Sequence, residues 1–368
     1  MACDYEAIRR DNERRYGTDI GRIGPMLLAD RYDDRTHFIF ELLQNAEDAL
    51  GRREGWKGSR AVSFQLSEAA LRIEHYGMPF DEADVRGICG IAESTKDLTA
   101  IGRFGIGFKS VYAVATRPEI HSGAESFAIQ SFVWPVAVQA INRAPDATVI
   151  LIPLATTGGG DHDALARGLG LLDPSALLFL RQIEEIRWNV EGGRSGLYLR
   201  ESREIEAEVR RVTVIGQAHK QPDIAEEWLI FSRAVSTKDG RHAGDVELAF
   251  SLEADRAPQQ ERITRIARSP LAAFFPTVVE THLGFLVQGP YRTTPSRDNV
   301  PRGDAWNQHL LRETAALLER SLRWLRDNDR LDTEALRCLP LDATKFGESS
   351  MFAPLYEATK SALSTDAL

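Results

Sequence analysis

The chain has 368 residues, which is enough for two domains of ordinary size. Hydrophobic residues make up 43% and charged residues 27%, a composition typical of folded globular proteins that excludes a mainly disordered chain. The 45 Lys and Arg against 54 Asp and Glu give a net charge of −9. No cationic field over the whole chain therefore favours nucleic acid, although a local basic patch stays open.

The three cysteines, Cys3, Cys89 and Cys338, lie far apart and form no Cys-x-x-Cys pair, so neither a disulfide framework nor a structural zinc site is expected. The N-terminus lacks the apolar run of a signal peptide, and no stretch approaches the ~18 apolar residues of a membrane span. We therefore expect a soluble, cytoplasmic protein without a membrane segment. The chain stops just after a helix-like segment without a cap, which favours the front portion of a longer protein.

Two α+β domains are expected, separated by a flexible tract at 156–161 that follows the apolar run 148–154. In the first domain, 1–155, we predict helices at 35–51, 81–91 and 105–115 and strands at 61–66, 70–75, 126–134 and 147–154. In the second, 161–330, we predict helices at 163–180 and 304–327 and strands at 184–190, 196–200, 206–215, 226–234, 245–252 and 283–290. A helical extension at 331–368 completes the chain.

The helix predicted at 35–51 carries a polar ridge opposite its apolar arc. At about 100° per residue, Glu41, Asn45 and Asp48 follow the spacing i, i+4, i+7 and align on one face. Two carboxylates and a carboxamide in a row can hold a magnesium ion and a water. The ordinary alternative, a solvated polar face, stays open for this helix taken alone.

A glycine-rich run follows at 101–112, with Gly102, Gly105 and Gly107. Glycines let backbone N–H groups approach an anion at a helix N-terminus. The run misses the Walker A pattern because Phe108 separates Gly107 from Lys109, and it lacks the Rossmann order of glycines. Taken alone, the run has two interpretations, a phosphate cradle or a glycine turn that packs a helix tightly.

The order of these motifs resembles the GHKL ATPase superfamily with its Bergerat nucleotide-binding fold. The motifs are the helix segment 41–49, a strand and turn with Gly77, the polar run 91–96, the glycine run 101–108 and the strand that begins at Thr148. Within the superfamily the chain looks most like the ninety-kilodalton heat-shock chaperones and the sacsin-like ATPases. The resemblance covers about residues 10–155. It implies a Bergerat-type α/β sandwich followed by a transducer-like α+β domain with a helical C-terminal end.

The resemblance also implies roles for individual residues. Glu41 would orient and deprotonate the attacking water, and Asn45 would complete the shell of a magnesium ion that bridges the phosphates of ATP. Thr148 would help to hold adenine through a water. The other nucleotide contacts that it implies are Asp48 on the helix, Gly77 in the turn, Ser94, Thr95 and Lys96 in a lid, and Gly102, Arg103, Phe104, Gly105, Ile106, Gly107, Phe108 and Lys109 in the phosphate loop.

Two further positions bear on the chemistry. Where the family usually has an aspartate that accepts a hydrogen bond from the adenine amino group, this chain has His75. A neutral imidazole nitrogen can accept such a bond, water or Glu74 could do so instead, and His75 can equally be a packed strand-end residue. Arg297 resembles the arginine that heat-shock chaperones send from the middle domain to the terminal phosphate, and a solvated surface arginine is the alternative.

The expected function is an ATP-binding, Mg²⁺-dependent, ATP-hydrolysing conformational switch with a chaperone-like remodelling role. The expected partners are a second copy, bound through the segment before residue 35, and an unknown protein client. A GHKL subunit of a prokaryotic DNA-handling or defence system is the first alternative, although the net charge of −9 weighs against a nucleic-acid partner. A nucleotide-sensing module without turnover is the second. A histidine kinase is disfavoured because little chain precedes the motif helix.

Overall fold

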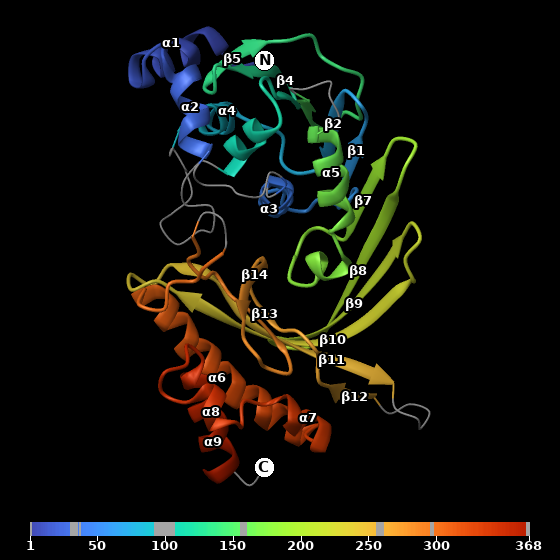
Figure 1. Ribbon diagram of the computed structural model, residues 1–368, viewed down its shortest axis with the longest axis vertical. Coiled ribbons are helices and arrows are strands. Elements are labelled where there is room, and N and C mark those ends of the chain that lie inside the picture. The colour runs from blue at the N-terminus through green and yellow to red at the C-terminus, as the bar shows by residue number, and fades with distance from the viewer. Residues whose placement is uncertain are drawn as a thin grey trace. The chain divides into compact units, whose positions relative to one another are not determined.

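The computed structural model describes residues 2–29, 36, 38–91, 107–154, 160–254, 261–294 and 298–365. The chain divides into two compact units, whose elements are labelled in Figure 1. Unit 1 consists of Met1–Leu98, Gly102–Arg200 and Ile215–Ile224, and unit 2 of Thr99–Ile101, Glu201–Val214 and Ala225–Leu368. Each unit combines helices with mostly antiparallel strands, so the α+β class predicted from the sequence is confirmed.

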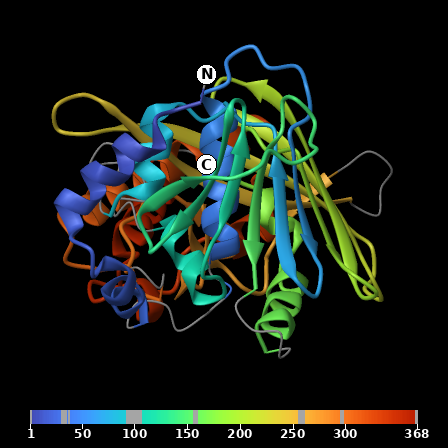
Figure 2. The same cartoon turned by 90° about the horizontal axis from the view of Figure 1, so that it is seen from above.

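Unit 1 has a strand layer and a set of helices. Its strands follow the order β5-β4-β3-β6-β2-β1-β7, and Figure 2 shows them side by side. The strands are β1 (Ala61–Leu66), β2 (Ala70–His75), β3 (Glu119–Ser122), β4 (Glu125–Gln130), β5 (Trp134–Ala137), β6 (Thr148–Pro153) and β7 (Glu185–Val190). The helices are α1 (Tyr5–Tyr16), α2 (Ile20–Ala29), α3 (Phe38–Gly51), α4 (Glu82–Cys89), α5 (Gly160–Gly170) and the 3₁₀ turns η1 (Gly107–Ala113) and η2 (Pro174–Leu177).

Alternating side chains give the central strands of unit 1 two different faces. In β2, Leu71, Ile73 and His75 are buried, whereas Arg72 and Glu74 are partly exposed on the other face. The neighbouring strands pair antiparallel in a register that places His75 beside Thr148 of β6. Since side chains of paired residues share a face, the buried face carries His75 and Thr148 together.

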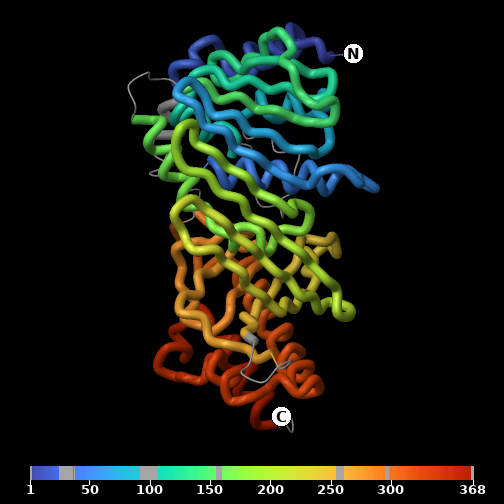
Figure 3. The backbone as a smooth tube through the Cα atoms, turned by 90° about the vertical axis from the view of Figure 1, so that its right-hand side faces the viewer, coloured from blue at the N-terminus to red at the C-terminus, as the bar shows by residue number. Residues whose placement is uncertain are grey.

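Unit 2 is built from long strands and a C-terminal group of helices. β8 (Ser195–Glu206) and β9 (Val209–Ala218) have residues in both units. The other strands are β10 (Ile224–Ser236), β11 (His242–Ala254), β12 (Glu261–Thr264), β13 (Pro270–Ala273), β14 (Phe275–Glu280) and β15 (Leu286–Gln288). The helices, which form the red end of the tube in Figure 3, are α6 (Ala305–Asp327), α7 (Thr333–Cys338), α8 (Ala343–Phe346) and α9 (Ala353–Thr365).

The core of unit 2 lies between α6 and the strands. Asp304 caps α6 by accepting hydrogen bonds from the backbone N–H groups of Trp306 and Asn307. Phe231 of β10 packs edge-on against Trp324 of α6, with ring centroids 5.3 Å apart. The apolar stripe of a 23-residue helix therefore closes one face of these strands. Among the described residues of both units, no helix is long and apolar enough to cross a membrane.

Three predicted elements take a different form in the structure. The helix expected at 105–115 is the short 3₁₀ helix η1, and residues 101–106 lie outside the described part. The strand expected at 126–134 is two strands, because Ser131 and Phe132 adopt positive φ angles of 43° and 74° and turn the chain. The helix expected at 163–180 ends at Gly170, and a separate 3₁₀ turn begins at Pro174.

Candidate functional site

The polar ridge predicted on α3 faces outward, while most of the other residues of the helix are buried. Asn45 is exposed, and Glu41 and Asp48 are partly exposed. The buried side of α3 consists of Phe38, Ile39, Leu42, Leu43, Gln44, Ala46, Glu47, Ala49 and Leu50. Asn45, in the middle of the ridge, is therefore the member of the three that is most open to solvent. Glu41 and Asp48 both make polar contacts within the protein as well.

One end of the ridge meets the glycine-rich run. Gly107 follows Glu41 by 66 residues in the sequence, yet a Cβ atom added to Gly107 would overlap the Glu41 carboxylate. The glycine thus allows the backbone at the start of η1 to lie directly against the acid. This brings the predicted water-activating carboxylate and one predicted phosphate-loop residue to the same place. We call Glu41 and Gly107 the phosphate end, after the roles that the resemblance implies for them.

The other end of α3 meets the ends of β2 and β6. A Cβ atom on Gly77 would overlap the Ala49 side chain, and the N–H of Met78 donates to the Ala49 carbonyl at 2.8 Å. His75 lies two residues before this turn, beside Thr148 in the strand register. The structure therefore brings Ala49, Gly77, His75 and Thr148 together, and we call these four residues the base end.

Thr148 is fixed by a hydroxyl pair within the base end. Its Oγ1 atom lies 2.5 Å from Ser122 Oγ of β3, and the same Ser122 oxygen accepts a hydrogen bond from the Phe80 N–H at 3.0 Å. All of these groups are buried or partly buried. Ser122 is a residue of this region that the sequence analysis missed, because the pairing of β3 with β6 places it there and no motif marks it.

The protonation state of His75 follows from its surroundings. The ring is buried, with 4% of its surface exposed, and burial lowers the pKa of His75 to about 4. Its Nδ1 atom accepts a hydrogen bond from the backbone N–H of Gly77 at 3.2 Å. The imidazole is therefore neutral near pH 7, and the nitrogen that could have accepted a bond from an adenine amino group already has a donor.

Phe108 and Lys109, the last two residues predicted in the phosphate loop, are buried. The Lys109 amine donates to the Phe132 carbonyl at 2.5 Å, and burial lowers the pKa of Lys109 to about 8. That carbonyl belongs to the positive-φ turn between β4 and β5. In this structure Lys109 thus anchors η1 to the turn.

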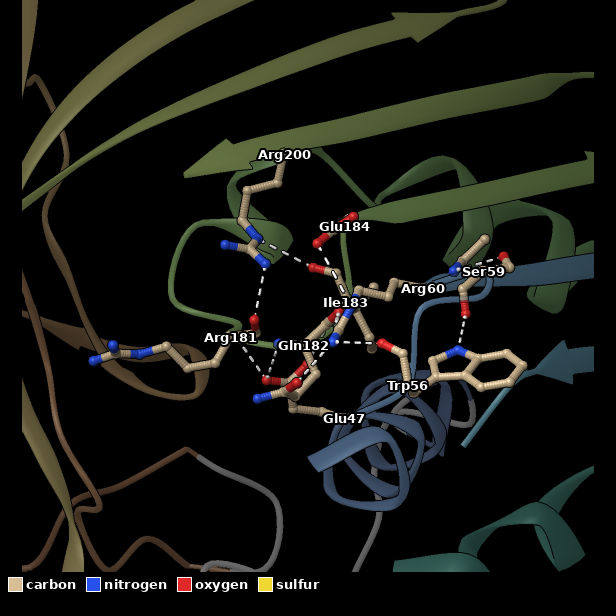
Figure 4. Close-up of polar contacts among 10 residues, drawn as sticks. Glu47, Trp56, Ser59, Arg60, Arg181, Gln182, Ile183, Glu184 and Arg200 are labelled. Atoms are coloured by element: carbon tan, nitrogen blue, oxygen red, sulfur yellow. Dashed lines mark hydrogen bonds and ion pairs between the residues drawn. The ribbon is translucent and has the colours of Figure 1, made fainter. Parts of the chain in front are cut away.

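Glu47, a second carboxylate on α3, was not singled out by the sequence analysis. Its oxygens accept hydrogen bonds from the N–H groups of Arg181 at 2.6 Å, Gln182 at 2.9 Å and Ile183 at 2.9 Å (Figure 4). Burial raises the pKa of the Glu47 carboxyl, and the three amide donors oppose this shift. The contact ties the motif helix to the segment before β7. The position of the Glu47 carboxylate among the apolar residues of α3 was the sequence signal that could have revealed this contact.

Several predicted site residues lie outside the described part of the chain. They are Ser94, Thr95 and Lys96 of the expected lid, Gly102, Arg103, Phe104, Gly105 and Ile106 of the expected phosphate loop, and Arg297. Their roles stay predictions from the resemblance. A groove of about 760 Å³ lies elsewhere in unit 1, on the sheet face that carries Glu74, Tyr76 and Arg187, opposite to the face of His75.

No protein-family model matches the chain. Protein NO VEIN of Arabidopsis thaliana is 26% identical over 331 residues, which cover 83% of this chain and 12% of that protein. The chaperone protein HtpG of Sulfurovum sp. (strain NBC37-1) is 28% identical over 136 residues, which cover 30% of this chain and 22% of HtpG. Sacsin of Homo sapiens is 34% identical over 112 residues, which cover 25% of this chain and 2% of sacsin.

The similarities to HtpG and sacsin lie in the N-terminal half of the chain, which contains α3 and the base end. They support a relationship to the GHKL ATPases, the superfamily that the motifs resemble. The chain spans less than a quarter of the length of each of these three relatives.

Proposed function

We propose that unit 1 is a Bergerat-type domain that binds Mg·ATP along α3 and hydrolyses it, and that the chain acts as a chaperone-like conformational switch. The observation that carries the proposal is the approach of Gly107 to the Glu41 carboxylate. A carboxylate beside backbone that can approach phosphate is the pair of groups that phosphoryl transfer to water requires. The similarity to the chaperone HtpG supports the same function.

The residues of the phosphate end fit the chemistry of hydrolysis. Glu41 would accept a hydrogen bond from a water near the terminal phosphate and take its proton as the water attacks. The Gly107 backbone would lie close to the phosphates, where a side chain would collide with Glu41. The carboxamide oxygen of Asn45, one helical turn from Glu41, is a hard oxygen ligand suited to Mg²⁺, which neutralises phosphate charge when bound.

The remodelling role and the partners belong to the same proposal. HtpG is a chaperone protein, so a protein client is the partner that this similarity favours. A homodimer contact through the segment before residue 35 and a γ-phosphate contact by Arg297 rest on the resemblance described above. A doubling of the mass in light scattering with a slowly hydrolysed ATP analogue would support the dimer, and an unchanged mass would contradict it.

Steady-state ATPase measurements on the full chain test the proposal. Glu41→Gln should keep Mg·ATP binding and lose about 10²-fold or more in turnover, since general base catalysis is typically worth about 10² to 10⁴. Glu68→Gln, at an exposed position between β1 and β2, is the matched control and should leave turnover unchanged. Absence of Mg·ATP binding by the wild-type chain would refute the proposal. Binding without measurable turnover would favour the nucleotide-sensing alternative.

A further inference from the structure

His75 lies at the end of α3 where the base of the proposed nucleotide would sit. From Glu41 to Ala49 the helix advances eight residues, or about 12 Å at its usual rise. An extended nucleoside triphosphate covers a comparable distance. With its phosphates at Gly107, its base therefore comes near Gly77, which contacts Ala49, and near His75.

The hydrogen bond at Nδ1 determines what His75 can offer to a base. A backbone N–H group can only donate, so Nδ1 carries the lone pair that accepts from Gly77. A neutral imidazole has one ring proton, which must then reside on Nε2. Within the described part of the chain, Nε2 has no hydrogen-bond partner. The Nε2–H group, which is the part of His75 that remains available to a ligand, is consequently a hydrogen-bond donor.

We propose, building on the proposed function, that His75 donates Nε2–H to the base and that the site therefore accepts 6-oxopurine nucleotides as well as adenine nucleotides. Adenine offers the ring nitrogen N1 as an acceptor on this edge, and a 6-oxopurine offers the oxygen O6. The adenine amino group is itself a donor, so it gains nothing from facing Nε2–H. Selection of adenine through its amino group is absent from such a site.

Binding of Mg·ATP and Mg·ITP to the full chain tests this inference. Inosine triphosphate differs from ATP only at the purine edge in question, because it lacks the 2-amino group that GTP carries. For the wild-type chain we expect dissociation constants within about threefold of each other, less than the roughly tenfold effect of one hydrogen bond. An ATP preference of about tenfold or more in the wild-type chain would overturn the inference.

Variants separate the role of His75 from other causes of equal binding. His75→Phe keeps a buried ring and removes the donor, so the affinities for Mg·ATP and for Mg·ITP should each fall by about tenfold. Glu74→Gln, the neighbouring position on the opposite face of β2, is the control and should leave both affinities unchanged. Unchanged affinities in a folded His75→Phe variant would overturn the assignment of His75 to the base.

The two proposals fail in different ways. If neither nucleotide binds the wild-type chain, the proposed function fails and the base assignment fails with it. If ATP binds and ITP does not, the proposed function stands and the inference about His75 is overturned. Should the His75→Phe variant not fold, the ratio of the two dissociation constants of the wild-type chain decides the question by itself.

Discussion

The two ends of α3 are assembled in different ways. At the phosphate end, a backbone position without a side chain lies against the flexible tip of Glu41. At the base end, Gly77 lies against the Cβ atom and backbone of Ala49, and His75 and Thr148 are buried. The phosphate end can therefore adjust when a ligand arrives, whereas the base end is packed rigidly. Under the proposed function, chemistry would take place at the adjustable end and recognition at the rigid one.

The largest expected effect concerns the buried imidazole of the base end. The pKa of His75 is about 4 in the folded chain, against 6.5 for the ordinary value. Between these pH values the unfolded chain binds more protons, so the free energy of unfolding should fall as the pH falls from 6.5 to about 4, by up to about 3 kcal/mol. Urea unfolding across this range should show the loss.

His75→Gln provides the reference for that measurement, because glutamine does not titrate and its oxygen can accept from the Gly77 N–H. The other titratable groups ionise equally in both chains, so the difference between wild type and variant isolates His75. Parallel curves for the two chains would show that His75 is not buried in its neutral form.

The same substitution at the two ends sharpens the comparison. Gly77→Ala should lower the free energy of unfolding by about 1–3 kcal/mol, because the new methyl group meets atoms of Ala49 that cannot move aside. Gly107→Ala should displace the Glu41 carboxylate, which can rotate away, and should lower turnover by about 10²-fold with stability nearly unchanged.

Gly303→Ala is the control for both variants, since no atom lies within 4 Å of the added Cβ there. Urea unfolding and ATPase rates measured on all three variants complete the test. Equal stability losses for Gly77→Ala and Gly107→Ala would remove the distinction between a rigid and an adjustable end.

The smallest effect is expected for the exposed amide in the middle of the ridge. Asn45→Ala should weaken Mg·ATP binding by about tenfold and leave binding in the presence of EDTA unchanged, because the lost oxygen contacts the metal. Asn189→Ala, also an exposed amide in unit 1 but on β7, is the matched control. Equal losses with and without Mg²⁺ would assign Asn45 to the nucleotide rather than to the ion.

The pattern of polar and apolar residues along a segment was sufficient to predict some strands of the fold and not others. The strands at 61–66 and 70–75 match β1 and β2, because residues of alternating polarity mark them. The interruption between β4 and β5 at Ser131 and Phe132 could not be predicted from the sequence, since neither serine nor phenylalanine commonly adopts a positive φ angle. β12 and β13 were missed because each has only four residues, and β14 was missed because Pro276 interrupts its strand pattern.

The motif helix, its polar ridge and the position of the glycine run could be predicted without a structure, because helical periodicity and glycine spacing are local properties. Three contacts required the folded structure: Gly107 lies against Glu41, His75 pairs with Thr148, and Glu47 accepts three amide hydrogen bonds from residues 181–183. Strand register and the close approach of backbone segments depend on how distant parts of the chain pack. The tautomer of His75, and with it the polarity that the base end presents, follows from that packing.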